Sequence, residues 1–245
     1  IVIALAMLGV FSNAKAADLD LIESPHTIAI KTGDRTVLEY QRTSNPYKVY
    51  IRSLTTPDGL QILRDSPHDH VHHHAMMYAI GADGVDFWIE NPAAKPGKQV
   101  PQKTQAAITK LSPGGQQATI EQAISWVDAQ QQPVLEEARS ITVPAAAIDG
   151  ATLVTWQSQF RPAGDKRTAD LWGRHYFGLG VRFVTSMDRV GRFFNATGEQ
   201  GESVRGTERL VPATWCAYTA PVDGKPVTVA MFDDPDNARH PAAWF

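Results

Sequence analysis

Ala118–Val127 (ATIEQAISWV), Val134–Val143 (VLEEARSITV) and Ala151–Phe160 (ATLVTWQSQF) set the fold class of this sequence. Each run has the length and the β-branched and aromatic content of a strand. Turn-forming residues separate them, Gln130–Pro133 after the first run and Ile148–Gly150 after the second. Three successive strands joined by short turns predict an antiparallel meander.

The same pattern extends on both sides of this meander. A hairpin is predicted where a Thr-Gly-Asp turn separates Thr27–Lys31 from Thr36–Tyr40. A second hairpin is predicted where Gly81–Gly84 separates Ala75–Ile80 from Val85–Glu90. Further strands are predicted at 47–52, 175–183, 191–194, 207–218 and 226–232, and an exposed loop at 91–106. Because no linker or internal repeat interrupts the pattern, we predict one all-β domain over residues 17–245, a large antiparallel β-sandwich.

The composition is that of an ordinary globular protein. Of 245 residues, 43% are hydrophobic and 20% are charged, and the net charge is -3. This length is sufficient for a full hydrophobic core. No basic stripe or Lys/Arg run is present, which argues against nucleic acid as a partner. Cys216 is the one cysteine, so no internal disulfide is possible.

The first 16 residues have the pattern of a secretory signal. The apolar run Ile1–Phe11 precedes Ala14-Lys15-Ala16, which matches an A-x-A cleavage site and predicts cleavage after Ala16. The alternative is a buried N-terminal strand or helix. The run is too short to span a membrane, which takes roughly 20 residues. We therefore predict an exported protein, periplasmic or extracellular, without a membrane span.

At the C-terminal end, Trp244-Phe245 closely follows a turn-like segment, so we expect a further strand beyond it.

Five of the eight histidines lie within residues 68–74. The segment reads Arg64-Asp65-Ser66-Pro67-His68-Asp69-His70-Val71-His72-His73-His74. Neutral imidazole is the commonest metal ligand and also titrates near neutrality. The two aspartates in the segment can orient the imidazoles or stabilise their protonated forms. A cluster of this density predicts a functional site.

Two chemistries are open at this cluster. If the segment is extended, His68, His70, His72 and His74 share one face, and His70, His72 and His74 form the better metal-binding trio. Such a site would hold zinc or another divalent metal and activate a water molecule for hydrolysis. Without a metal, the histidines would act as general acids and bases in a cleft. Some of the five are also expected to be structural, bonded to backbone carbonyls.

A second candidate region surrounds His175. It lies between Arg174 and Tyr176 and follows Trp172, and such a mixture of aromatic and polar groups suits sugar recognition. A buried histidine with a satisfied donor is the alternative. Asp86 is a candidate carboxylate at the end of a strand near the cluster, and its alternative is a solvated hairpin residue.

Several segments resemble a family of exported bacterial proteins labelled methane oxygenase PmoA-like. They are Thr56–Gly59, Arg64–His74, Gly84–Trp88, Gly173–Gly180 and Asp234–Pro241. The resemblance covers residues from about 45 to the end and departs at His74, where many relatives carry Arg. It implies no methane oxidation, because the true methane monooxygenase subunit is an integral membrane protein and this chain has no predicted span.

A second resemblance concerns aldose 1-epimerases. His175–Leu179 is similar to one of their strands, and Asp69–His73 is similar to one of their loops. This similarity implies a galactose mutarotase-like β-supersandwich in which His175 is the acid and His72 holds the ring oxygen or the C1 hydroxyl of a sugar. The base would come from a later strand. Fold analogy does not by itself establish function.

We therefore expect an exported carbohydrate-active protein, a hydrolase, lyase or epimerase acting on a carbohydrate or glycoside. The predicted catalytic residues are His72, His175 and Asp86. The predicted substrate-binding residues are Arg64, Asp65, His68, Asp69, His73, Arg174, Tyr176 and His240. The alternatives are a metal-dependent hydrolase or oxidase that uses His70, His72 and His74, and a sugar-binding module without catalysis.

Overall fold

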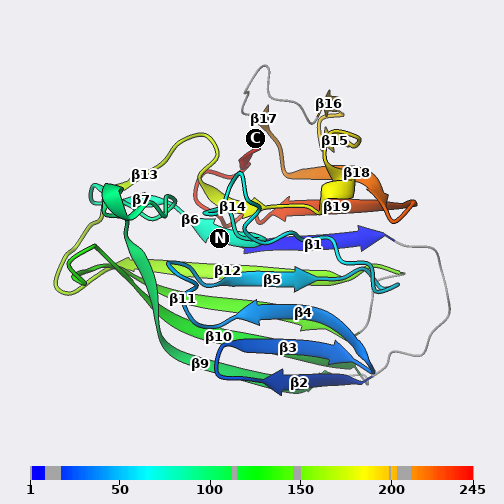
Figure 1. Cartoon of the computed structure of the whole chain (residues 1–245), viewed down its shortest axis with the longest axis horizontal. Helices are drawn as coiled ribbons and strands as arrows, with labels where there is room; N and C mark the ends of the chain where they lie inside the picture. Colours follow the sequence, from blue (N-terminus) through cyan, green and yellow to red (C-terminus); the bar gives the residue numbers. More distant parts are fainter. Residues whose placement is uncertain are drawn as a thin grey trace.

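The computed structural model describes residues 2–8, 18–111, 115–145, 150–198, 200–202 and 211–244, with side chains in all of these except 2–8 and 200–202. The described chain is almost entirely β, which confirms the predicted fold class (Figure 1). Two short 3-10 helices, η1 (Pro92–Ala94) and η2 (Thr185–Met187), interrupt it. No helix in the described ranges is long and apolar enough to cross a membrane.

The larger of the two main sheets has nine strands. In spatial order these are β16 (Gln200–Glu202), β15 (Arg192–Asn195), β18 (Trp215–Val222), β19 (Lys225–Asp233), β1 (Val2–Leu8), β12 (Leu153–Pro162), β11 (Pro133–Pro144), β10 (Gly115–Val127) and β9 (Lys98–Leu111). Neighbouring strands are antiparallel throughout. The predicted meander is confirmed as β10, β11 and β12.

The second main sheet has six strands. Its order is β14 (Gly178–Val181), β6 (Met76–Ala79), β5 (Tyr50–Leu54), β4 (Arg35–Gln41), β3 (Thr27–Thr32) and β2 (Leu19–Glu23). Two small sheets are formed by β13 (Leu171–Trp172), β7 (Gly81–Ala82) and β8 (Val85–Asp86), and by β17 (Val211–Pro212) and β20 (Ala243–Trp244). The hairpin predicted over residues 27–40 is confirmed as β3–β4. The predicted pairing of Ala75–Ile80 with Val85–Glu90 is wrong in its partners, because β8 pairs with β7, which was assigned to the turn, and β6 pairs with β5 and β14.

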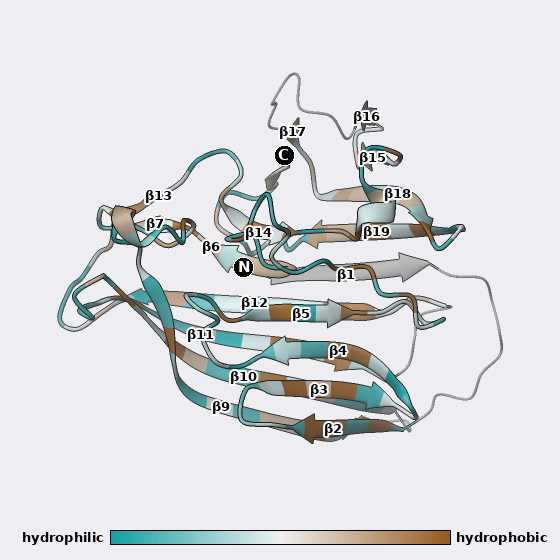
Figure 2. Ribbon diagram, in the orientation of Figure 1, coloured by the Kyte–Doolittle hydropathy of each residue, from teal (hydrophilic) through white to brown (hydrophobic). Residues whose placement is uncertain are grey.

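The two main sheets pack face to face. Figure 1 shows β2–β5 as one layer and β9–β12 as the layer behind it. One hydrophobic cluster draws residues from both sheets, including Ile28 and Tyr40 from the six-stranded sheet and Trp126, Ile141 and Trp156 from the nine-stranded one. In Figure 2 the ribbon of β3 is brown over most of its length, and β9–β12 carry both brown and teal segments.

A buried ion pair joins the two layers at their centre. Arg139 of β11 binds Glu137 through two hydrogen bonds of 2.8 and 2.9 Å. It also donates to the hydroxyl of Tyr40 on β4 and stacks 4.4 Å from the Trp156 ring centroid. The indole N–H of Trp126 donates to Glu137 at 2.8 Å. Both charges are therefore satisfied, as buried charges in a core must be.

Residues 91–106 were predicted as a loop, and this prediction is wrong for residues 98–106. β9 begins at Lys98 and pairs with β10 along its whole length. The strand is polar because it is the outer edge of the nine-stranded sheet, where no further strand of the described residues pairs with it and polar side chains oppose aggregation. Its composition reflects the edge position and not the absence of structure.

The N-terminal segment has a defined place in the sheet. The backbone of β1 pairs with β12 on one side and β19 on the other. The predicted cleavage position after Ala16 lies outside the described residues, so removal of residues 1–16 and export both stay predictions.

Candidate functional site at the histidine loop

The site is built on the outer face of the six-stranded sheet. Met76 and Tyr78 of β6 point into the main core, so Met77 and Ala79 point the other way. They form a second hydrophobic cluster with Tyr50 and Trp88, and Tyr176 and Phe177 pack against it. This small cluster is the floor on which two loops meet.

The histidine loop, residues Arg64–His74, connects β5 to β6 by a series of turns. The amide of His70 donates to Pro67 O at 2.8 Å, and that of His73 donates to His70 O at 2.9 Å. Ser66 has a positive φ of 43°. The loop is therefore not extended, and the predicted shared face of alternate histidines is wrong. In Figure 1 it rises beside β14, and the amide of Arg64 donates to Arg182 O just after that strand.

His74 is the buried end of this loop. Its Nδ1 lies 2.8 Å from Asp65 Oδ1 and its Nε2 lies 3.0 Å from Glu90 Oε1, while its ring stacks on Tyr50 at 4.3 Å. A histidine whose two nitrogens both face carboxylates is a double donor, the imidazolium form. Burial alone would lower the pKa of His74, but hydrogen bonds to Asp65 and Glu90 outweigh burial and raise it.

Lys48 completes a buried ionic network under the loop. Its side chain is 1% exposed, and Nζ lies 2.6 Å from Glu90 Oε1. The same ammonium donates to the carbonyls of Trp88 at 2.7 Å and His72 at 3.3 Å. Two cations, Lys48 and His74, thus face two anions, Glu90 and Asp65, so the charges balance. The network fixes the backbone of His72 relative to the sheet.

The predicted metal-binding trio is not formed. Both nitrogens of His74 are taken by carboxylates, so His74 has no lone pair to offer a metal. The rings of His70 and His72 lie 6.0 Å apart between centroids. Across the part of the chain that the structure describes, no group of three His, Cys, Asp or Glu side chains has the geometry to hold a metal ion.

The three middle histidines of the loop have different environments. His72 is half-buried, and burial, followed by the charges of Lys48 and His70, lowers its pKa. His73 packs edge-on against Trp88 at 5.4 Å, and burial, followed by the charge of Arg182, lowers its pKa to about 3. His70 is also half-buried and lies 3.1 Å from Asp69 Oδ2. His72 is therefore a neutral imidazole at pH 7, partly open to solvent.

The second loop, Gly173–Phe177, meets the histidine loop at Trp88. Phe177 stacks on Trp88 at 5.2 Å, and Tyr176 lies against the same indole at 5.4 Å. His175 is exposed and sits edge-on to Tyr176 at 5.0 Å. Arg174 donates to the Tyr176 hydroxyl at 3.3 Å. Two segments about 100 residues apart in sequence therefore place His73, Tyr176 and Phe177 around one indole, with His175 beside Tyr176.

Four predicted site residues have other surroundings. Arg64 bonds Thr185 Oγ1 at 2.7 Å and Asp188 at 2.8 Å, which ties the loop to η2. Asp86 accepts the amides of Trp88 and Ile89 through Oδ1, so it stabilises a turn. His240 bonds Asp233 at 2.7 Å in the turn after β19. His68 is exposed at the loop surface.

The network residues Lys48, Tyr50, Glu90 and Trp88 were not predicted as part of the site. Tyr50 donates to Asp65 at 2.7 Å, and Glu90 binds both Lys48 and His74. One signal was available, since Lys48 and Glu90 are charged residues at the ends of otherwise apolar runs. Nothing local indicated that these two would be buried together.

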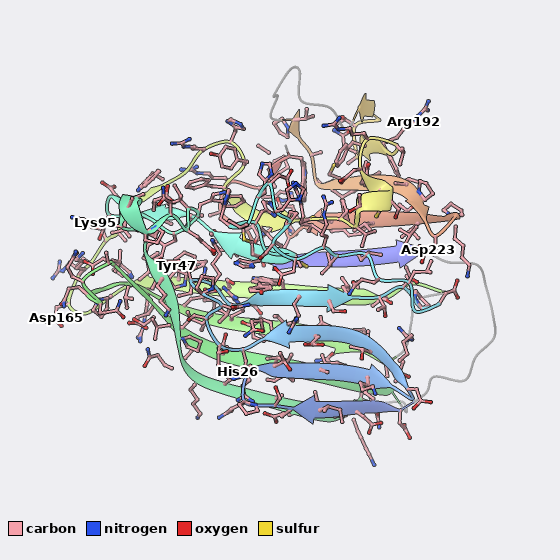
Figure 3. All side chains as sticks on the ribbon, viewed as in Figure 1. His26, Tyr47, Lys95, Asp165, Arg192 and Asp223 are labelled. Carbon is pink, nitrogen blue, oxygen red and sulfur yellow. The ribbon has the colours of Figure 1, made fainter. Side chains whose placement is uncertain are left out.

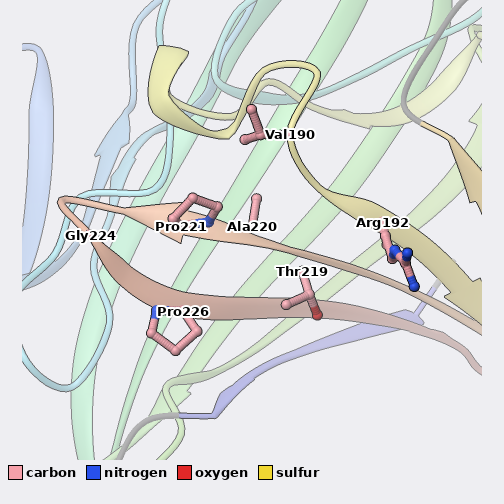
Figure 4. A pocket seen from close by; sticks show the side chains of 7 residues that line it. All are labelled: Val190, Arg192, Thr219, Ala220, Pro221, Gly224 and Pro226. Atoms are coloured by element: carbon pink, nitrogen blue, oxygen red, sulfur yellow. The ribbon is translucent and has the colours of Figure 1, made fainter.

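A shallow hollow of about 390 Å³ lies elsewhere, at the β18–β19 hairpin (Figure 4). Its lining residues are Val190, Arg192, Thr219, Ala220, Pro221, Gly224 and Pro226. The lining is largely apolar with Arg192 as its charged group, and it contains no predicted site residue. We do not assign it to the candidate site.

Fold and site together define an all-β sandwich protein with a histidine loop anchored by a buried ionic network. The chain belongs to a family of unknown function, DUF6807, whose model matches residues 27–245. A search of curated proteins and a search of solved structures found no match. The matched family is described neither as methane oxygenase-like nor as mutarotase-like, so it brings no activity to this chain.

Proposed function

We propose that the protein recognises a carbohydrate at the histidine loop and acts on it by acid–base catalysis, as a hydrolase, lyase or epimerase. The observation that supports this proposal is the meeting of the histidine loop and Gly173–Phe177 at Trp88. Aromatic faces stack on the C–H surfaces of sugars, and neighbouring polar groups bind hydroxyls. Tyr176 and His175 supply both kinds of group beside the loop.

His72 is the candidate general base. Its lowered pKa keeps the imidazole neutral at pH 7, the form that accepts a proton. Lys48 donates to the His72 carbonyl from the buried side, so the backbone of His72 is tied to the sheet. His175, in the second loop, is the candidate acid. Asp86 is not carried into this proposal, because its Oδ1 is engaged by backbone amides.

A screen of neutral and acidic sugars, by calorimetry for binding and by proton NMR for turnover, tests the proposal. His72→Ala should lower turnover by about 100-fold or more, the usual range for loss of a general base. His26→Ala is the matched control, since His26 (labelled in Figure 3) is exposed just before β3, and three strands separate β3 from β14 in the sheet. Absence of sugar binding in the whole screen would overturn the proposal.

A sugar-binding module without catalysis is the second candidate. The observation that favours it is that Asp65 and Glu90 are fully engaged by His74, Tyr50 and Lys48, which leaves neither carboxylate free as a catalytic partner. This candidate predicts that sugar binding is saturable and that neither the parent chain nor His72→Ala shows turnover.

A further inference from the structure

The backbone of Arg182 is fixed between the two ends of the histidine loop. Its amide donates to Ala75 O at 2.6 Å, and its carbonyl accepts the amide of Arg64 at 2.9 Å. Ala75 follows the loop and Arg64 begins it. The Arg182 side chain therefore extends from a rigid position beside the loop, and it is 25% exposed.

The guanidinium of Arg182 lacks a close acceptor. Its Nη2 is 3.5 Å from His70 Nδ1 and 3.7 Å from Asp69 Oδ1, and its Nε is buried without a hydrogen-bond partner among the described residues. Charge-assisted hydrogen bonds are normally about 2.7–2.9 Å long. Arg64 and Arg139 reach their carboxylates at 2.8 Å. Arg182 thus has unused donors on a partly exposed side chain, whereas Arg64, whose Nε also lacks a partner, has its two terminal nitrogens bonded to Thr185 and Asp188.

The neighbouring acids do not fill this gap. Asp188 binds Arg64, Glu90 binds Lys48 and His74, and Asp65 binds Tyr50 and His74. Asp69 is the acid that faces Arg182, and its carboxylate leans to His70 at 3.1 Å and stays outside hydrogen-bond distance of Arg182. An anion from outside the chain would be the first close acceptor for this guanidinium.

We propose that the histidine loop binds an acidic sugar, with the carboxylate of a uronic acid residue held by Arg182. This inference rests on the proposed function and names its substrate class. A planar guanidinium pairs with a carboxylate through two parallel hydrogen bonds, which an ammonium cannot do.

The test is equilibrium binding to the full chain of glucuronate and galacturonate oligosaccharides and of their carboxyl-reduced, neutral counterparts. Uronates should bind about 10-fold more tightly or better, as one charge-assisted pair allows. Arg182→Gln should reduce uronate affinity to that of the neutral sugars, and Arg182→Lys should recover only part of it. Arg192→Gln, which changes an exposed arginine of β15, is the matched control. Thermal unfolding checks that each variant is folded.

The failures of the two proposals are distinguishable. If the neutral sugars bind as well as uronates and Arg182→Gln changes neither, the acidic-sugar inference is overturned and sugar recognition stands. If sulfated neutral sugars bind and uronates do not, the carboxylate assignment is overturned. If no sugar binds, both the proposed function and this inference are overturned.

Discussion

At the scale of single residues, His74 shows how a buried histidine can hold a functional loop. It donates to Asp65 and Glu90 and stacks on Tyr50, so its charged form is the one that the fold stabilises. Hydrogen bonds to charged groups contribute more to stability than neutral ones, on the order of 2 kcal/mol each. The loop consequently depends on the protonation of one imidazole.

This arrangement predicts a pH-dependent stability with a defined sign. The folded-state pKa of His74 is raised above its ordinary value, so its contribution is complete below the unfolded-state pKa, about 6.5, and is lost as pH rises through the folded-state pKa. His74→Gln should therefore lower the free energy of unfolding by about 2 kcal/mol near pH 5.5, and by progressively less above pH 6.5. Urea unfolding at several pH values measures the difference.

The control for this experiment is His26→Gln, an exposed substitution expected to stay within about 0.5 kcal/mol of the parent chain across the range. A His74→Gln deficit that stayed constant or grew with pH would contradict the imidazolium assignment.

At the scale of elements, the strands were predictable and the site was not. Period-two alternation along β10, β11 and β12 is local information, and so is the turn chemistry at Asp83-Gly84, where both residues have positive φ as a tight hairpin requires. β9 was not predicted because an edge strand can be polar along its length and need not alternate polar and apolar side chains.

The geometry of the site depends on contacts that no local pattern contains. Lys48 and Glu90 are 42 residues apart, and His74 meets Glu90 across 16 residues. The sequence identified the histidine loop and His175 as regions of interest. It did not identify their common floor, because Trp88 and Tyr50 are ordinary aromatic residues in apolar runs. Turns in the loop, which begin at Ser66 and Pro67, removed the strand geometry on which the metal prediction depended.

A glycine on β7 provides a prediction at this scale. A Cβ placed on Gly81 would lie 2.1 Å from the Trp172 ring, so the β7–β13 pair requires a glycine there. Gly81→Ala should destabilise the protein by about 1–3 kcal/mol and change the fluorescence of Trp172 as its ring is displaced. Gly115→Ala is the matched control, since its nearest neighbour lies at an ordinary 3.7 Å and the cost should be within about 0.5 kcal/mol. Equal costs for the two would refute the close contact.

At the scale of the whole molecule, the nine-stranded sheet depends on a strand from the N-terminal segment. β1 is the element between β12 and β19, and its backbone pairs with residues 153–157 on one side and 228–233 on the other. The meander of β9–β12 and the β18–β19 hairpin are thus joined in one sheet through β1. If residues 1–16 are a signal peptide, their removal opens this sheet at its middle.

Comparison of the 17–245 chain with the 1–245 chain tests this dependence. Backbone amides and carbonyls at a newly opened edge lose their partners and exchange hydrogen faster. We expect faster deuterium uptake at residues 153–157 and 228–233 in the shorter chain, measured by mass spectrometry, and unchanged uptake in β10, which pairs with β9 and β11 in both. Equal protection in the two chains would mean that β12 and β19 do not depend on β1. Because the histidine loop is built on the six-stranded sheet, the 17–245 chain should bind sugar as the 1–245 chain does. Equal binding would show that the site does not require β1.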